Sequence, residues 1–68
     1  MMEVVVNGER RTVRAAGIRE LLAELGYGPD RPGIAVALNA EVVPRSEWDR
    51  TRLGPGDRVE IVGAVQGG

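Results

Sequence analysis

Residues 2–14, MEVVVNGERRTVR, hold the pattern from which the rest of the fold can be worked out. Two short runs, 2–6 and 11–14, contain β-branched residues and lie on either side of Asn7-Gly8. Asn-Gly is the dipeptide that most readily accepts the positive φ angles of a two-residue hairpin turn. The segment therefore predicts two antiparallel strands joined by a tight turn.

The next segment predicts a helix over residues 18–25. Four apolar side chains follow the i, i+3, i+4, i+7 spacing of one helical face: Ile18, Leu21, Leu22 and Leu25. Gly17 can serve as the N-cap, and Gly26 suits the left-handed position that ends a helix. We expect about three helical turns, with the apolar face packed on the strands.

The second half of the chain predicts further strands. Residues 34–38 alternate large and small apolar side chains, residues 39–41 resemble a turn, and Pro44 confines the short strand 42–43 to a sheet edge. Turn formers fill 53–57, and residues 58–62 alternate polar and apolar side chains. The order predicts an α+β fold in which one main helix packs on one face of a mixed four- to five-stranded sheet. The expected inward-facing side chains are Val4, Val6, Val13, Val36, Leu38, Val59 and Ile61.

Composition limits what such a chain can do. It has 68 residues, nine Arg and ten acidic residues, no Lys and a formal net charge of −1, which gives no general attraction to nucleic acid or membranes. It has no Cys and no His, which excludes the commonest transition-metal ligands and nucleophiles, so we expect no metal site. No apolar stretch approaches the length of a membrane span, and no secretory signal precedes the first strand, so we expect a cytoplasmic protein.

The residues after the last strand form the candidate functional segment. We expect a folded domain over 1–63 and a flexible tail over 64–68, in which Gly67 and Gly68 could thread a channel too narrow for other residues. The α-carboxylate of Gly68 must be activated before it can react, and the chain has no GxxxxGK[ST] phosphate loop for ATP. A partner would then bind ATP and activate Gly68, which could accept sulfur as a thiocarboxylate. The chain itself would be a carrier and not an enzyme; the simpler interpretation of the tail is a frayed terminus.

Other residues have weaker claims to function. Trp48 is expected in the core, and Arg45 and Gly56-Asp57 are expected to be a solvated side chain and a turn. A tail alone offers little binding surface, so docking should also use outward-facing residues of the sheet. The candidates for this docking face are Val5, Glu60, Val62 and Ala64.

Several motifs together resemble those of the ThiS family, the sulfur carriers of thiamine biosynthesis. They are Ala37-Leu38-Asn39, Val43-Pro44-Arg45-Ser46-Glu47-Trp48, Gly56-Asp57 and Gly67-Gly68, in an order that spans nearly the whole chain. The resemblance implies a ubiquitin-like β-grasp fold and places the modified group, first adenylate and then thiocarboxylate, at Gly68. It implies that Val65, Gln66 and Gly67 thread a partner's active site. The implied partners are an adenylating enzyme that uses ATP, a sulfur donor of the cysteine desulfurase route, and thiazole synthase.

Two alternatives remain at this stage. Related carriers of molybdopterin synthesis or tRNA thiolation share the fold and the terminal Gly-Gly, although Val65 and the lack of any Phe favour the thiamine branch. A β-grasp binding module, such as an RNA-contacting or regulatory domain, would make no use of the tail. A mildly acidic chain with one Trp and one Tyr argues against RNA.

Overall fold

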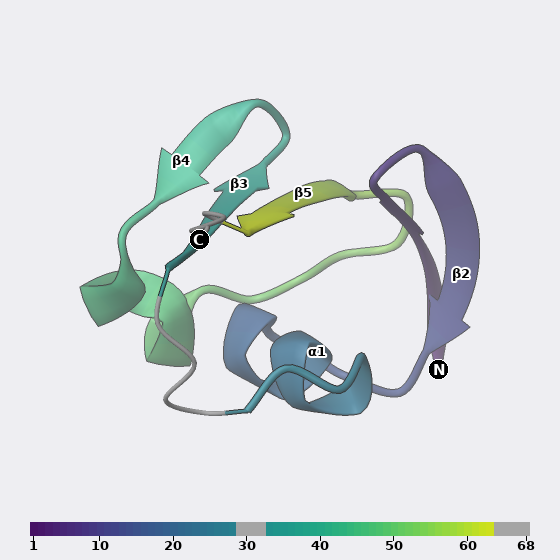
Figure 1. Cartoon of the computed structure of the whole chain (residues 1–68). Coiled ribbons are helices and arrows are strands. Elements are labelled where there is room, and N and C mark those ends of the chain that lie inside the picture. Colours follow the sequence, from purple (N-terminus) through teal and green to yellow (C-terminus); the bar gives the residue numbers. More distant parts are fainter. Residues whose placement is uncertain (29–32, 64–68) are drawn as a thin grey trace.

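The computed structural model of the chain describes residues 1–28 and 33–63. Figure 1 shows a five-stranded sheet with the helix α1 lying across one of its faces. The elements are β1 (Met2–Val6), β2 (Glu9–Val13), α1 (Ile18–Glu24), β3 (Ile34–Leu38), β4 (Glu41–Val43), the 3-10 helix η1 (Arg45–Arg50) and β5 (Arg58–Gly63). The strand order is β2-β1-β5-β3-β4, which is a ubiquitin-like β-grasp arrangement and confirms the expected fold class.

The strand β5 holds the sheet together. It pairs in parallel with β1 and antiparallel with β3, so the two hairpins β1–β2 and β3–β4 meet only through it. The short strand β4 lies at the sheet edge before Pro44, as the sequence predicts. The strand β5 pairs with β1 at Arg58 and Val59 and with β3 from Val59 to Gly63.

The first hairpin has the expected two-residue turn. Asn7 and Gly8 adopt φ angles of 50° and 85°, and Val6 lies opposite Glu9 in the register. A turn in which both central residues have positive φ matches the twist of the flanking strands. The strand β2 begins at Glu9, two residues before the predicted start, because the tight turn lets pairing resume at once.

The helix α1 is shorter than predicted. It spans seven residues, about two turns, and not the expected three. Gly26 takes a φ of 98°, and the Tyr27 N–H donates to the Leu22 carbonyl at 2.8 Å. This pair of features is the Schellman ending, in which the helix ends at Glu24 and Leu25 is the C-cap.

The core fills the space between α1 and the sheet. Six of the seven predicted inward side chains are buried: Val4, Val6, Val13, Val36, Val59 and Ile61. Leu38 is half-buried and packs at the margin of the core. Arg58 and Glu60 are exposed, which confirms the predicted register of the last strand. Ala15, Leu53 and the helix residues complete the core, and no membrane-spanning helix occurs in the described part of the chain.

Trp48 belongs to this core, as predicted, and reaches it from η1. Its side chain is 3% exposed, and its Nε1 donates to the Val43 carbonyl oxygen at 2.9 Å. Arg45 is exposed, as expected, but its guanidinium carbon lies 4.6 Å from the centroid of the Trp48 ring, and that of Arg19 lies 5.4 Å away. Both distances are within the range of cation–π attraction, so the arginines help to cover the ring.

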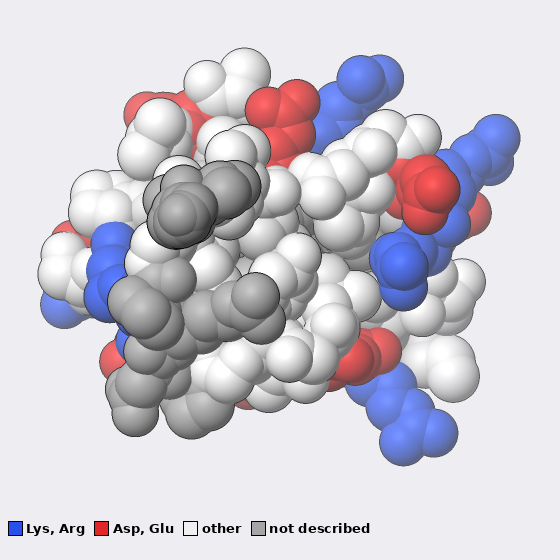
Figure 2. Space-filling model, viewed as in Figure 1, with Lys and Arg blue, Asp and Glu red and all other residues white. Residues whose placement is uncertain are grey.

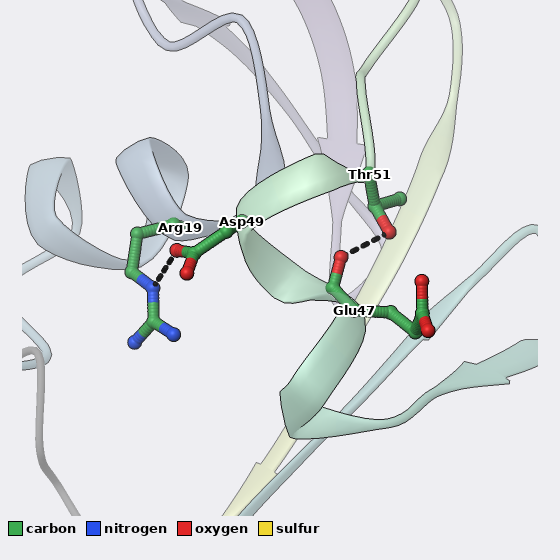
Figure 3. A network of polar contacts seen from close by, with 4 residues as sticks. All are labelled: Arg19, Glu47, Asp49 and Thr51. Carbon is green, nitrogen blue, oxygen red and sulfur yellow. Dashed lines mark hydrogen bonds and ion pairs between the residues drawn. The ribbon is translucent and has the colours of Figure 1, made fainter.

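One polar contact joins η1 to α1, and another closes the end of η1 itself. The Arg19 Nε lies 2.7 Å from the Asp49 Oδ1, and the Thr51 hydroxyl donates to the Glu47 carbonyl oxygen at 2.7 Å (Figure 3). The first contact joins the two helices and the second closes the end of η1. The pair Arg19 and Asp49 is partly exposed, so it contributes less to stability than the burial of Trp48 does.

Candidate functional site

The proposed reactive segment follows β5 directly. The predicted site residues Val65, Gln66, Gly67 and Gly68 lie outside the described residues, as does Ala64 of the candidate docking face. The boundary between a domain at 1–63 and a tail at 64–68 therefore stays a prediction. Gly63, the last described residue, is exposed and lies opposite Ile34 of β3 in the register.

The described candidates for docking lie on one face of the sheet. Along β5, Val59 and Ile61 point to the core, so Glu60 and Val62 point to the opposite side, which we call the open face. Val5 pairs with Arg58, which has the same orientation as Glu60. Val62 is 63% exposed and Val5 is half-buried. Val5, Glu60 and Val62 thus share one face of the sheet, and their role in docking stays a prediction.

The open face also has apolar residues that the sequence analysis missed. Val42 of β4 is 72% exposed, Ala35 lies opposite Val62, and Ala37 lies between Val42 and Glu60 in the register. Together Ala35, Ala37, Val42 and Val62 form the open-face patch. The alternation of Val42 with the inward-facing Val43 gave a local signal for its exposure. Its place on the same face as Val62, with β3 between the two strands, depends on strand pairing, which local patterns do not reveal.

Charge varies across the open face. Arg10 and Arg58 are the register partners of Val5 on its two sides, so the part of the open face near β1 and β2 is basic. In Figure 2 basic side chains gather on the side of the molecule that β2 occupies in Figure 1. The open-face patch lies at the other end, where Val62 immediately precedes Gly63. A protein partner with an apolar centre and acidic groups on one side would complement this arrangement.

The described residues offer little for small-molecule chemistry. Within 1–28 and 33–63 no group of three or more acidic, His or Cys residues could hold a metal ion. Two surface grooves, of about 250 and 260 Å³, lie at opposite edges of the sheet. Both are smaller than the roughly 300–1,000 Å³ typical of pockets that enclose a small ligand.

The chain matches known proteins over almost its whole length. The model of the ThiS family matches residues 4–68. The sulfur carrier protein ThiS of Thermus thermophilus is 38% identical over 65 residues, covering 96% of this chain and 98% of that protein. A thiazole synthase of Paramagnetospirillum magneticum is 40% identical over 68 residues; the match covers 98% of this chain but only 20% of that longer protein.

Solved structures give the same result for the fold. A crystal structure of the thiamine biosynthesis protein ThiS from Geobacter metallireducens superposes with a TM-score of 0.81 at 36% identity, covering 98% of this chain and 100% of that one. A solution structure of a thiamine biosynthesis protein from the same organism gives a TM-score of 0.79 at 36% identity, with 98% and 88% covered. At this identity and coverage the resemblance extends beyond the shared fold to the sequence itself.

Proposed function

This chain belongs to the ThiS family of sulfur carriers in thiamine biosynthesis, and we propose that Gly68 is the residue on which it carries sulfur. The observation that supports this assignment is the extent of the family match, which runs through residue 68. The segment that ends in Gly67-Gly68 is thus part of what the family shares. The family match also favours the thiamine branch over the related molybdopterin and tRNA carriers.

The proposed cycle has two chemical steps at Gly68. The carboxylate oxygen attacks the α-phosphorus of ATP, which forms an acyl-adenylate and releases pyrophosphate. Hydrosulfide then attacks the acyl carbon, the bond to AMP breaks, and a thiocarboxylate, AMP and a proton result. No electrons are exchanged in either step when hydrosulfide is the donor. Thiocarboxylate sulfur is a good nucleophile, so the loaded chain can pass its sulfur on.

A partner must supply the catalysis in this proposal. The chain lacks Cys and His and has no GxxxxGK[ST] loop, so the usual nucleophiles and phosphate cradle are not encoded. We therefore assign ATP binding to an adenylating enzyme and expect no cofactor on this chain. In the cell, a donor of the cysteine desulfurase route would provide the sulfur. The chain acts as a protein substrate and not as an enzyme.

Thiazole synthase is the proposed acceptor of the sulfur. The support comes from the relative in Paramagnetospirillum magneticum, in which a segment like this chain is part of a longer protein named thiazole synthase. Covalent linkage in one protein raises the local concentration of two modules that act on each other.

Docking is proposed to use the open-face patch together with the tail. Val42 and Val62 are the large apolar side chains most exposed among the described strand residues, at 72% and 63%. Burying them against a partner would offset part of the entropy lost when the tail is ordered in an active site. Because Val62 is next to Gly63, docking there would hold the start of the tail at the partner's surface.

The decisive test extends the chain by one residue. Purified chain is incubated with its adenylating enzyme, ATP and sulfide, and intact mass reports the exchange of one oxygen for sulfur. A chain ending in Gly68 should be loaded, whereas Gly68 followed by Ala should not, because an added residue moves the carboxylate by roughly 3.5 Å and leaves an amide at the reacting carbon. Chain incubated without the enzyme serves as the control and should keep its mass.

Two further observations sharpen this test. Gly67→Val should slow loading, because a β-branched side chain widens the segment, and should leave the melting temperature of the domain unchanged. Efficient loading of the extended chain without trimming would rule out Gly68 as the carrier residue. Transfer of the loaded sulfur to molybdopterin or tRNA in preference to thiazole would rule out the assigned pathway.

A further inference from the structure

Asn7 makes contacts that its role in the hairpin turn does not require. Its Oδ1 accepts a hydrogen bond from the Ile61 N–H at 2.8 Å, and its Nδ2 donates to the Ile61 carbonyl at 3.3 Å. The two residues are 54 positions apart in the sequence. One side-chain amide thus satisfies both backbone groups of a residue in β5.

These contacts continue the pairing of β1 with β5. The Val5 N–H donates to the Asp57 carbonyl, and the Asn7 N–H donates to the Val59 carbonyl, both at 2.9 Å. The next residue of β5 with the same orientation is Ile61, but the chain has already turned away at Gly8. The Asn7 side chain takes the place of the strand residue that would otherwise pair there. The hydrogen bonding of β5 on the β1 side thus continues from Val59 to Ile61.

The position of this contact matters because it lies close to the end of β5. Ile61 is two residues before Gly63, and on its other side β5 remains paired with β3 up to the pair of Gly63 with Ile34. The hydrogen bonds of Asn7 are therefore the last described contacts of β5 on the β1 side before residues 64–68, which lead to Gly68. With Asn7 in place, β5 is held from both sides at Ile61.

We propose that Asn7 is a positioning residue for sulfur loading, which fixes the direction in which the chain leaves β5. The inference rests on the proposed function of Gly68. When the open face is docked on a partner, the end of β5 sets the point from which residues 64–68 must reach the partner's active site. Fraying of β5 at Ile61 would move that point, and misplacement of a reacting group by about 1 Å can slow a reaction by 10²-fold. The Asn7 contact opposes this fraying and so acts on the rate of loading.

Asn39 provides a matched control within the same strand. It also occupies the first position of a two-residue hairpin turn, with a φ of 52° against 50° for Asn7. Its Oδ1 accepts from the Arg58 N–H at 2.9 Å, at the opposite end of β5. Removing either side chain deletes an amide contact to β5, but only Asn7 holds the end that leads to Gly68.

The experiment compares Asn7→Gly with Asn39→Gly, since Gly accepts both turn conformations. Loading with the adenylating enzyme, ATP and sulfide is measured as a function of chain concentration. For Asn7→Gly we expect kcat to fall about tenfold while KM stays within about twofold, because the docking face is unchanged. For Asn39→Gly both constants should stay within about twofold of the unsubstituted chain.

Amide hydrogen exchange supplies a readout that is independent of loading. Asn7→Gly removes the oxygen that accepts from the Ile61 N–H, so exchange should be faster selectively at Ile61. Asn39→Gly removes the acceptor of the Arg58 N–H and should have the same effect at Arg58. If the Asn7→Gly variant is unfolded by circular dichroism, Asn7→Asp replaces it and is compared with the unsubstituted chain. Asn39→Asp is not used, because it would place a carboxylate beside Asp57, to whose Oδ1 the Asn39 Nδ2 donates at 3.2 Å. Asp keeps an acceptor oxygen but loses the amide donor, so the same difference in kcat is expected with a smaller size.

The outcomes separate the two proposals. A selective fall in kcat for the Asn7 variant, with faster exchange at Ile61, supports the positioning role. Equal kcat values for the Asn7 and Asn39 variants would overturn it, whether both are slow or both normal, and leave the assignment of Gly68 intact. Failure of the unsubstituted chain to load would instead overturn the proposed function, and the positioning role with it.

Discussion

The two faces of the sheet are built from the same strands but differ in what their side chains do. On the face toward α1, Val4, Val36 and Val59 are at most 1% exposed. On the open face, Val42 and Val62 are 72% and 63% exposed. Because side chains alternate along a strand, adjacent residues serve different faces. Substitutions one position apart should therefore separate stability from partner binding.

The largest effect is expected from Leu21→Ala, in the helix that packs on the inner face of the sheet. Leu21 is fully buried in α1, so its truncation leaves a cavity and should lower the free energy of unfolding by about 2–5 kcal/mol. Urea denaturation followed by circular dichroism measures this loss. Val62→Ala removes apolar atoms from the open face and should change the same quantity by less than about 0.5 kcal/mol. Similar losses for the two variants would contradict the division between the faces.

A smaller loss is expected where η1 closes the core, from Trp48→Phe. The ring stays apolar, but the Val43 carbonyl loses the donor that now lies 2.9 Å away. Leaving a partly buried acceptor unpaired should lower the unfolding free energy by about 1–3 kcal/mol. Arg50→Ala breaks only an exposed ion pair with Glu47 and should cost under about 1 kcal/mol in the same urea titration. An unchanged midpoint for Trp48→Phe would show that the hydrogen bond contributes nothing.

The open face should respond in binding and not in stability. Val62→Asp places a charge in the open-face patch and should weaken affinity for the adenylating enzyme about tenfold, which corresponds to about 1.4 kcal/mol. Thr12→Asp adds the same charge at an exposed position of β2 outside the patch and controls for net charge. Isothermal titration calorimetry measures both affinities, and urea denaturation should show both variants as stable as the parent. Equal affinities for the two variants would remove Val62 from the docking site.

The smallest effect is expected in the turn at Asn39-Ala40, which joins β3 and β4 and belongs to neither face. Ala40 has a φ of 72°, a conformation that L-residues with a Cβ adopt only with strain. Ala40→Gly should raise the unfolding free energy by about 0.5–1 kcal/mol. Ala23→Gly makes the same chemical change at an exposed helix position and should lower it by about 1 kcal/mol. Thermal unfolding of both variants checks the opposite signs, and a destabilised Ala40→Gly would show that the turn carries no strain.

Local patterns were enough to predict most of the fold. Alternation placed Val59 and Ile61 in the core, Asn7-Gly8 marked the hairpin, and Gly26 marked the end of the helix. The 3-10 helix η1 was not predicted, because its six residues are held by the burial of Trp48 and not by a helical pattern of their own. The helix length was overestimated because the apolar spacing includes Leu25, which is the C-cap and not a residue of the helix itself.

The candidate site was only partly predictable. Alternation put Val5, Glu60 and Val62 on one face. The place of Val42 on that same face depends on the pairing of β3 with its two neighbours, β4 and β5. The amide contacts of Asn7 depend on a partner 54 residues away. No local pattern encodes such a contact, since it forms only when the sheet is assembled. The assignments at Val65, Gln66, Gly67 and Gly68 fall outside the described residues and stay proposals.

The central place of β5 also has a consequence for the timing of folding. This strand is the last in sequence among the described elements, yet it lies between β1 and β3, and Val5 pairs with Arg58 across most of the chain. Pairings of such sequence separation are slow to form and cannot begin until both partners exist. A growing chain therefore stays without its sheet centre until residues 58–63 have been made. A chain that stops earlier would expose two unjoined hairpins, and we expect it to be degraded as unfolded protein, so the proposed docking face requires synthesis through β5.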